Sequence, residues 1–312
     1  MDNKLTIIDV NAWLGPWPFQ YFHDDTAALL EARMRAHGIS HALVGSPEAA
    51  FNPDLLAVNR LHLQRLAGSK VLHPVVALDP TKGDWKDILA LGLKAGVAAV
   101  RLFPGYHIYE LSSAPALAAV EAVAKAGSLA LLVQMRMEDE RTHHPLCKIP
   151  AVSAASIIEL ARRFPGLQVV ACCPYYHEAR DLAKGPSNVS FEISHVEWLR
   201  TIGTLTRDVP KERVLFGTHM PFIQSYAAVM KLDAPYVPAE TQVAIGAGNA
   251  TRIFGKALTA APKAPAAHKA PAAHKAAPRA ATRKASANKA VGKAAKRSLR
   301  KAARPAAKRR GR

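Results

Sequence analysis

The sequence predicts an α/β fold, a (β/α)8 TIM barrel over residues 1–258 that is followed by a disordered basic tail over residues 259–312. Short apolar runs rich in β-forming residues alternate with longer segments of helical period, which indicates repeated βα units around a parallel sheet. The 258 residues of the body come close to the roughly 250 that are typical of one such barrel. After Leu258 the composition changes abruptly to Ala, Lys, Arg and Pro, which excludes a second core.

Eight strands and eight helices can be placed along the body in alternation, and a ninth helix follows. In order, the apolar runs that predict strands are Leu5–Val10, Ala42–Gly45, Leu72–Leu78, Ala98–Phe103, Leu129–Met135, Leu167–Cys172, Val189–Ile193 and Val214–Gly217. The segments of helical period between and after them are Asp25–His37, Pro53–Leu66, Trp85–Ala95, Ala114–Ala126, Ala151–Phe164, His177–Ala183, Glu197–Thr206, Pro221–Met230 and Ala239–Ile245. Eight strands in this length fit a closed barrel better than an open sheet.

Cysteine usage and the termini indicate a reduced, cytoplasmic protein. Cys147, Cys172 and Cys173 form no disulfide framework, and two of them are adjacent. Residues 1–4 carry no basic stretch followed by an apolar run, so we expect no secretory signal. No apolar run approaches the roughly 18 residues that a membrane helix needs, and we expect no membrane partner.

Three phrases carry a resemblance to a known family. They are Ile7-Ile8-Asp9-Val10-Asn11-Ala12-Trp13-Leu14-Gly15, Val214-Leu215-Phe216-Gly217-Thr218-His219-Met220-Pro221, and the closing Asn-x-x-Arg-hydrophobic-Phe of residues 249–254. Over about residues 5–256 the chain resembles the amidohydrolase 2 branch of the amidohydrolase superfamily, whose members are metal-dependent hydrolases with TIM-barrel folds. The resemblance implies a barrel that the last phrase caps.

The resemblance also implies a divalent metal, but the ligand positions are changed. Family members use two His after strand 1, a His or Lys in mid-barrel, a His after strand 6 and an Asp after strand 8. The matching residues here are Asn11, Trp13, Gln134, Cys172 or Cys173, and His219. Indole cannot ligate a metal, and amides bind zinc poorly. We therefore expect no cofactor, although a non-standard divalent site completed by His177, His195 or Glu192 stays open.

Chemistry in such barrels lies at the carboxyl ends of the strands, and the polar residues there are the candidates. His219 stands where the family's general base stands, and a strand-end Glu192 and His195 complete the expected catalytic set. The guanidinium groups of Arg101 and Arg136 could each bind a carboxylate through two hydrogen bonds. The expected substrate-binding residues are Asn11, Arg101, His107, Tyr109, Gln134 and Arg136, with His107 and Tyr109 placed beyond a Pro104-Gly105 turn.

Two functions fit these residues. The first is a hydrolase or lyase that acts on a small carboxylate, ester or lactone, with little or no metal, with His219 as base and Arg101 and Arg136 holding the substrate. The alternative is a catalytically degenerate barrel that serves as a binding or scaffold protein. An enzyme should keep an open mouth lined by Arg101, Gln134, Arg136, Glu192 and His219, whereas a degenerate barrel should have it filled, with Trp13 and Tyr106 as candidates.

The tail predicts a second partner, nucleic acid. Residues 259–312 hold 17 of the 42 Lys and Arg residues and no acidic residue, which leaves 25 basic and 24 acidic residues in the body. The repeated Ala-Pro-Ala-Ala-His-Lys from Ala264 and the Ala/Lys/Arg blocks are similar in composition to linker-histone and Ala/Lys-rich histone-like tails. Such a chain displaces counterions from DNA, RNA or another polyanion without reading sequence, so nucleoid association is expected. A solubility tail is the competing interpretation.

Overall fold

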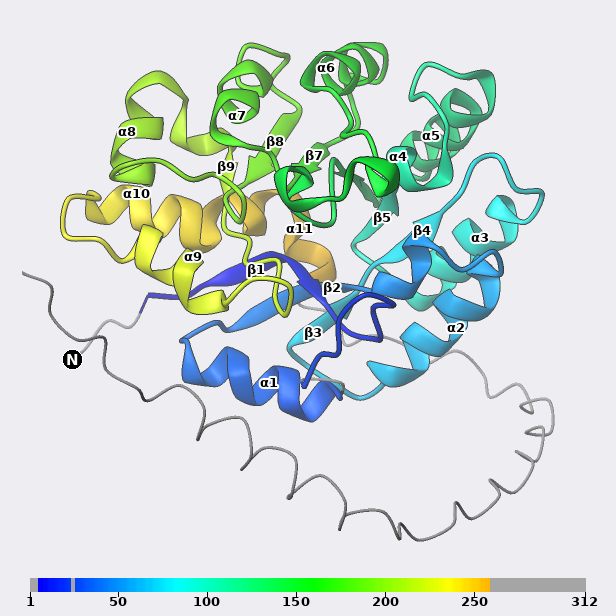
Figure 1. Cartoon of the computed structure of the whole chain (residues 1–312), viewed down its shortest axis with the longest axis horizontal. Coiled ribbons are helices and arrows are strands. Elements are labelled where there is room, and N and C mark those ends of the chain that lie inside the picture. Colours follow the sequence, from blue (N-terminus) through cyan, green and yellow to red (C-terminus); the bar gives the residue numbers. More distant parts are fainter. Residues whose placement is uncertain (1–4, 24–25, 259–312) are drawn as a thin grey trace, which may run out of the picture. The chain divides into compact units, whose positions relative to one another are not determined.

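The computed structural model describes residues 5–23 and 26–258, and its strands form one parallel barrel with helices around it (Figure 1). The larger apolar core lies between the strands and the helices, and a smaller one lies inside the barrel. Two hydrogen-bonded sheets, ordered β1-β2-β3 and β4 to β9, make up its wall. The strands are β1 Ile8–Trp13, β2 His41–Gly45, β3 Leu72–Pro74, β4 Val76–Leu78, β5 Ala99–Leu102, β6 Ala130–Gln134, β7 Val169–Cys172, β8 Val189–Glu192 and β9 Val214–Leu215.

The two sheets are continuous with each other. β3 and β4 are separated by Val75 alone, so they form one barrel strand, and the Val75 amide donates to Val44 O at 2.8 Å. At the other seam the Val10 amide donates to Phe216 O at 3.0 Å and the His219 amide donates to Asn11 O at 2.8 Å. The nine strands therefore make eight barrel strands, and the predicted (β/α)8 fold is confirmed. The predicted tail lies outside the described residues.

Helices follow the strands, and all but the last of the long ones lie around the outside of the barrel (Figure 1). They are α1 Ala27–Ala36, α2 Leu55–Arg65, α3 Trp85–Ala95, α4 Pro104–His107, α5 Ala114–Ala126, α6 Ala154–Arg163, α7 Tyr176–Leu182, α8 Thr201–Asp208, α9 Ser225–Leu232, α10 Ala239–Val243 and α11 Asn249–Leu258. Short 3-10 turns lie at Pro47–Ala50, Glu140–Thr142, Pro145–Cys147 and Lys211–Arg213. Within the described ranges, no helix is long and apolar enough to span a bilayer.

The amino end of the barrel is closed by α11. Ala250, Phe254 and Leu258 of this helix pack with inward-facing strand residues such as Val10 and Leu132. Phe254 is only 3% exposed. The helix is held in place by Asn249, whose side-chain amide donates to Val214 O and Lys211 O at 2.8 Å each. The closing phrase of the sequence therefore caps the barrel, as expected.

Three local expectations are wrong. The Pro104-Gly105 turn is the first turn of helix α4, since Pro fits at the first helical position, where it lacks only an amide that has no partner within the helix. Asn11 lies inside β1 rather than after it, because the strand begins at Ile8 and ends at Trp13, three residues later than predicted at each end. The last helix does not end at Ile245 but continues through a π turn, Ala244–Gly248, into α11.

We expect the substitution Phe254→Ala to lower the free energy of unfolding by about 3–5 kcal/mol, because it empties the plug of a closed core. Phe19→Ala is the matched control, since Phe19 is 70% exposed, and we expect it to cost at most about 1 kcal/mol. Urea denaturation of both variants measures the difference. Equal losses would show that α11 does not seal the barrel.

Candidate functional site

Eight side chains meet at the carboxyl end of the barrel, and together they form what we call the mouth cluster. They come from the four strands β1, β5, β6 and β8 and from the loops that follow β7, β8 and β9, and each is at most 2% exposed, which makes this a buried polar network. The members are Asn11, Trp13, Arg101, Gln134, Cys173, Glu192, Ser194 and His219.

Arg101 is the cation of this cluster. Its Nη1 donates to Asn11 Oδ1 at 2.8 Å and to Gln134 Oε1 at 2.7 Å. Its Cζ lies 4.1 Å from the centre of the Trp13 ring, a cation–π contact. Since a guanidinium only donates hydrogen bonds, it turns both amide oxygens toward itself and both amide NH2 groups away.

Those NH2 groups point at Cys173, which follows β7. Its Sγ lies 3.1 Å from Gln134 Nε2, 3.3 Å from Asn11 Nδ2 and 3.2 Å from His219 Nδ1. Burial raises the pKa of this thiol well above its ordinary value, so the sulfur is neutral. Cys173 has φ +61°, a strained conformation that turns its side chain into the mouth. Of the two cysteines left open by the sequence, Cys173 thus takes the mouth position, whereas Cys172 packs in the interior beside the α11 plug.

Glu192, at the end of β8, is surrounded by donors. Its Oε1 accepts from Cys173 N at 2.5 Å, Ser194 Oγ at 2.9 Å and Asn11 Nδ2 at 3.1 Å, and its Oε2 accepts from Ser194 N at 2.5 Å. The side chain packs so closely against Gly217 that a Cβ there would lie 2.8 Å from the Glu192 carboxyl carbon. The carboxylate is therefore fixed, and it has no side open to a ligand.

His219 is also held on both sides of its ring. Its Nδ1 accepts from the Trp13 indole at 2.9 Å, and its Nε2 lies 2.6 Å from Met137 O, so Nε2 carries the proton. Burial lowers the pKa of this imidazole well below its ordinary value, and the ring is neutral. Its residue conformation, φ +57°, is strained like that of Cys173.

A cavity of about 350 Å³ is lined by both His219 and His195. His195 is 8% exposed, and its Nδ1 lies 3.2 Å from Ser194 Oγ. Burial, aided by the nearby charges of Arg136 and Lys231, lowers its pKa to about 3. The lining residues are Gln20, Met137, Glu138, Asp139, Arg141, Tyr175, Ser194, His195, Glu197, His219, Phe222 and Ile223.

The other predicted substrate-binding residues do not reach this cavity. Arg136 pairs with Glu178 through two hydrogen bonds of 2.7 and 2.6 Å, donates to Cys173 O and stacks over Tyr175. His107 donates from Nε2 to Ala49 O at 2.8 Å. Tyr109 lines a separate cleft of about 680 Å³ between α4 and the segment Lys148–Ser153. The structure brings together Asn11, Arg101, Gln134, Glu192, His195 and His219, but neither His107 nor Tyr109.

Aromatic side chains cover the mouth. Trp13 is fully buried, and Phe222 lies 4.7 Å from His219, 5.1 Å from Trp17 and 4.8 Å from Phe22, measured between ring centres. The five polar residues expected to line an open mouth are all buried, and only His219 borders the cavity. Trp13 does fill the mouth, whereas Tyr106 packs at its edge against Phe103 and Phe51.

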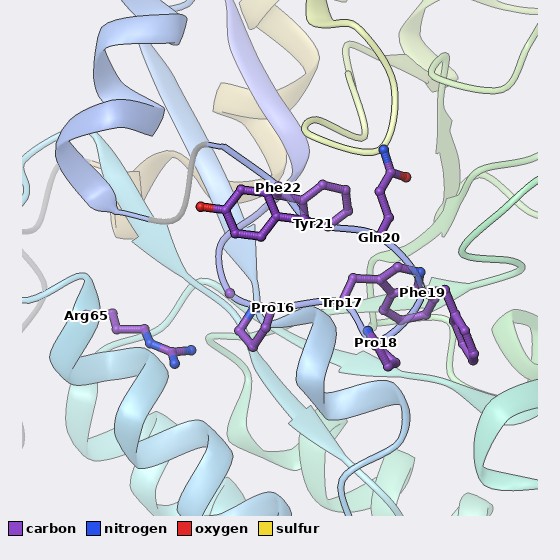
Figure 2. A pocket seen from close by; sticks show the side chains of 9 residues that line it. Pro16, Trp17, Pro18, Phe19, Gln20, Tyr21, Phe22 and Arg65 are labelled. Carbon is purple, nitrogen blue, oxygen red and sulfur yellow. The ribbon is translucent and has the colours of Figure 1, made fainter. Parts of the chain in front are cut away.

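The loop after β1 carries most of this cover. Figure 2 shows its residues Pro16 to Phe22 around a second cleft, of about 550 Å³, with Arg65 of α2 on the opposite side. Arg65 is already ion-paired with Glu48. The cleft contains none of the predicted site residues, so its chemistry is separate from that of the mouth cluster.

The mouth cluster does not fit a divalent metal. Cys173 and His219 are its best ligands, but the N–H groups of Asn11, Trp13 and Gln134 are directed at their sulfur and nitrogen atoms. The Arg101 cation lies directly behind these amides. Among the described residues, no group of three or more His, Cys, Asp or Glu is arranged to hold a metal ion.

Sequence reasoning missed Ser194 and Asp9. Asp9 accepts from the amides of Asn11 and Thr218 at 2.9 and 3.0 Å and from the Thr218 hydroxyl, so it ties β1 to the segment after β9. Burial raises its pKa to about 6. The sequence does contain a signal for Asp9, which is an acidic residue inside the apolar run 7–10. A carboxylate buried in such a strand requires hydrogen-bond partners.

Comparisons with known proteins agree with the barrel. The sequence model of the family described as amidohydrolase matches residues 15–256. No curated protein matches the chain by sequence. Similar solved structures include 2,6-dihydroxybenzoate decarboxylase from Rhizobium (16% identity, TM-score 0.65, covering 81% of this chain and 99% of that one). Another is 5-carboxyvanillate decarboxylase from Sphingomonas paucimobilis (16%, 0.60, 80% and 99%). A third is dihydroxybenzoic acid decarboxylase from Polaromonas with bound manganese and 2-nitroresorcinol (14%, 0.64, 80% and 97%).

Burial of His195 predicts a loss of stability in acid. Between pH 6.5 and about 3 the imidazole is protonated in the unfolded state but neutral in the folded state. The free energy of unfolding therefore falls as the pH falls. We expect this residue to account for about 2 kcal/mol of the stability lost between pH 7 and pH 5. Urea denaturation at both pH values should show a smaller loss for His195→Gln, and an unchanged loss for the exposed control His177→Gln. An equal loss in both variants would contradict a neutral, buried His195.

Proposed function

Because the chain belongs to the amidohydrolase family, we propose that its barrel is an enzyme, a hydrolase or lyase that acts on a small carboxylate, ester or lactone without a divalent metal. The observation that carries this proposal is the 350 Å³ cavity at the carboxyl end of the barrel, bordered by two neutral imidazoles, His195 and His219. The active sites of barrel enzymes lie at the carboxyl ends of the strands, and a neutral imidazole there can accept a proton.

His195 takes the role of base in this proposal, and His219 helps to position the site. Both nitrogens of His219 have partners within the chain, from Trp13 and Met137. Among the described residues, His195 has a hydrogen-bond partner only at Nδ1, so its Nε2 is the nitrogen available to the cavity. Glu192 acts through other residues, because its side chain is fully buried and its carboxylate already accepts four hydrogen bonds.

Arg141 on the cavity wall is the cation that a carboxylate substrate would reach. It is largely exposed and pairs with Asp139 at 2.5 Å, and a ligand carboxylate could exchange with that partner. Arg101 and Arg136 are buried and already bonded within the protein, so they support the site from behind. Proteins of similar fold are decarboxylases of aromatic acids, which supports the carboxylate class.

The chemistry is proposed to run without a bound metal ion such as manganese. Manganese is bound in the Polaromonas decarboxylase. In the mouth cluster the fixed positive charge is the Arg101 guanidinium, and its amide partners fill the positions from which a metal would be ligated. The proton acceptor in the cavity is then an imidazole rather than a metal-bound oxygen.

A second candidate function is a non-enzymatic binding barrel. The observation in its favour is the aromatic cover, since Trp13, Trp17 and Phe222 fill the space above the buried polar residues. Such a barrel would bind ligands in the cavity without converting them. Turnover, or its absence, in the experiments below separates the two functions.

Metal content tests the first part of the proposal. The purified full chain, incubated with manganese and zinc and then passed through a desalting column, should retain far less than one equivalent by elemental analysis. EDTA should leave its melting temperature unchanged, because no ion supports the fold. One tightly bound equivalent would overturn the metal-free mechanism.

Turnover tests the second part. We expect hydrolysis of a small aryl ester or lactone, or release of CO2 from a hydroxybenzoate, and we expect His195→Asn to lower kcat about 10²–10⁴-fold. The control His177→Asn, at an exposed position on α7, should keep full activity. If ligands shift the melting temperature but none of these probes is converted, the binding barrel is the better description.

The basic tail is proposed to hold the protein on DNA or RNA. The full chain should bind duplex DNA of any sequence, with an affinity that falls steeply between 50 and 200 mM salt, because binding releases counterions. A chain ending at residue 258 keeps a body with nearly balanced charge and should not bind measurably. Fluorescence anisotropy with two unrelated duplexes measures this, and equal binding by both chains would place the contact on the barrel.

A further inference from the structure

The strongest unexplained feature of the cavity wall is a chain of three polar groups, Glu192, Ser194 and His195. Glu192 is its fixed end, because a carboxylate only accepts hydrogen bonds and this one accepts four. Ser194 is 2% exposed, and both Ser194 and His195 border the cavity. The Nε2 atom of His195 has no hydrogen-bond partner among the described residues. The distances between these three groups show which atom carries each proton.

Ser194 has one hydroxyl proton and three neighbours that could receive it. Its Oγ lies 2.9 Å from Glu192 Oε1, 3.2 Å from His195 Nδ1 and 3.6 Å from Cys173 Sγ. The carboxylate is both the nearest acceptor and a strong one, so the proton belongs to that bond. The hydroxyl lone pairs are then left for His195, and the 3.2 Å contact requires a proton on His195 Nδ1.

The backbone that carries Ser194 is held by a buried cation on α9. Lys231 Nζ donates to Ile193 O and to Ser194 O at 3.0 Å each and pairs with Glu197 at 2.5 Å. Lys231 is only 8% exposed. Since Glu192 also accepts from the Ser194 amide, both ends of this residue are fixed and its hydroxyl has a single direction.

We propose that Glu192 and Ser194 form a relay that fixes His195 as the Nδ1-protonated tautomer, so that its Nε2 offers a lone pair to the cavity. Ser194 is a positioning residue that acts through His195. In this arrangement His195 and its neighbour His219 are opposite tautomers, because His219 carries its proton on Nε2. The cavity therefore receives an acceptor from His195, suited to the O–H of a water or of a substrate hydroxyl.

The proton transfer that this allows is balanced. An O–H bond of the water or hydroxyl breaks, an N–H bond forms at His195 Nε2, and the oxygen keeps the electron pair. The resulting imidazolium remains bonded through Nδ1–H to Ser194, whose hydroxyl is bonded to the Glu192 carboxylate. The catalytic use of this lone pair rests on the proposed function, but the tautomer itself does not.

Nitrogen NMR of the full chain labelled with ¹⁵N-histidine tests the tautomer directly. The His195 signals are identified by their loss in His195→Gln. We expect Nδ1 to carry the proton at pH 7, although free imidazole side chains prefer the Nε2-protonated form. A His195 that carries its proton on Nε2 in the unsubstituted protein would overturn the relay, whatever the variants do.

Two variants test the part played by Ser194. Ser194→Ala removes the acceptor of the Nδ1 proton, so we expect His195 to change to the Nε2-protonated form, and Ser194→Thr should retain the original one. Diethyl pyrocarbonate, which acylates an unprotonated imidazole nitrogen, should modify His195 several-fold more slowly in Ser194→Ala, as measured by peptide mass spectrometry. An unchanged tautomer in Ser194→Ala would overturn the role of Ser194. A confirmed tautomer without any turnover would refute the proposed enzyme and leave the relay intact.

Discussion

The mouth of this barrel depends on one constraint, the burial of a guanidinium and a carboxylate that do not contact each other. Arg101 and Glu192 are connected through Asn11, which accepts from the arginine and donates to the glutamate. A charge left without partners in a closed core costs several kcal/mol, so each neighbouring group must present the correct end. This fixes the direction of both amides, the surroundings of Cys173 and the proton of Ser194. The polar network is thus determined as a unit rather than residue by residue.

Much of the fold follows from local sequence, because its signals are local. The helices Trp85–Ala95 and Ala114–Ala126 have the predicted bounds, and strand placement failed only by a few residues. The expectation that polar residues at the carboxyl ends of the strands lie together also identified four residues that meet at the mouth, Asn11, Gln134, Glu192 and His219. Periodicity and strand ends are properties of short segments, and a single sequence contains them in full.

The partners of the charged groups could not be predicted, because they depend on distances between segments far apart in the chain. Arg136 is ion-paired with Glu178, which lies 42 residues later on α7. The choice between Cys172 and Cys173 required the exact end of β7, because Cys172 is the last residue of the strand and Cys173 follows it with a left-handed φ of +61°. Relatives with the same fold at 14–16% identity did not supply these partners either, because a fold places strand ends but not the chemistry on them.

Closure of the barrel at its first and last strands has a consequence for synthesis. Trp13 of β1 reaches its partner His219 across 206 residues of chain, and α11, which closes the amino end of the barrel, comes still later in the sequence. During translation β1 is therefore an unpaired sheet edge until nearly the whole body has left the ribosome. Such non-local pairing folds slowly, and the nascent chain exposes apolar strands throughout that period. The first strand of this domain therefore cannot complete its pairing before the last strand has been synthesised.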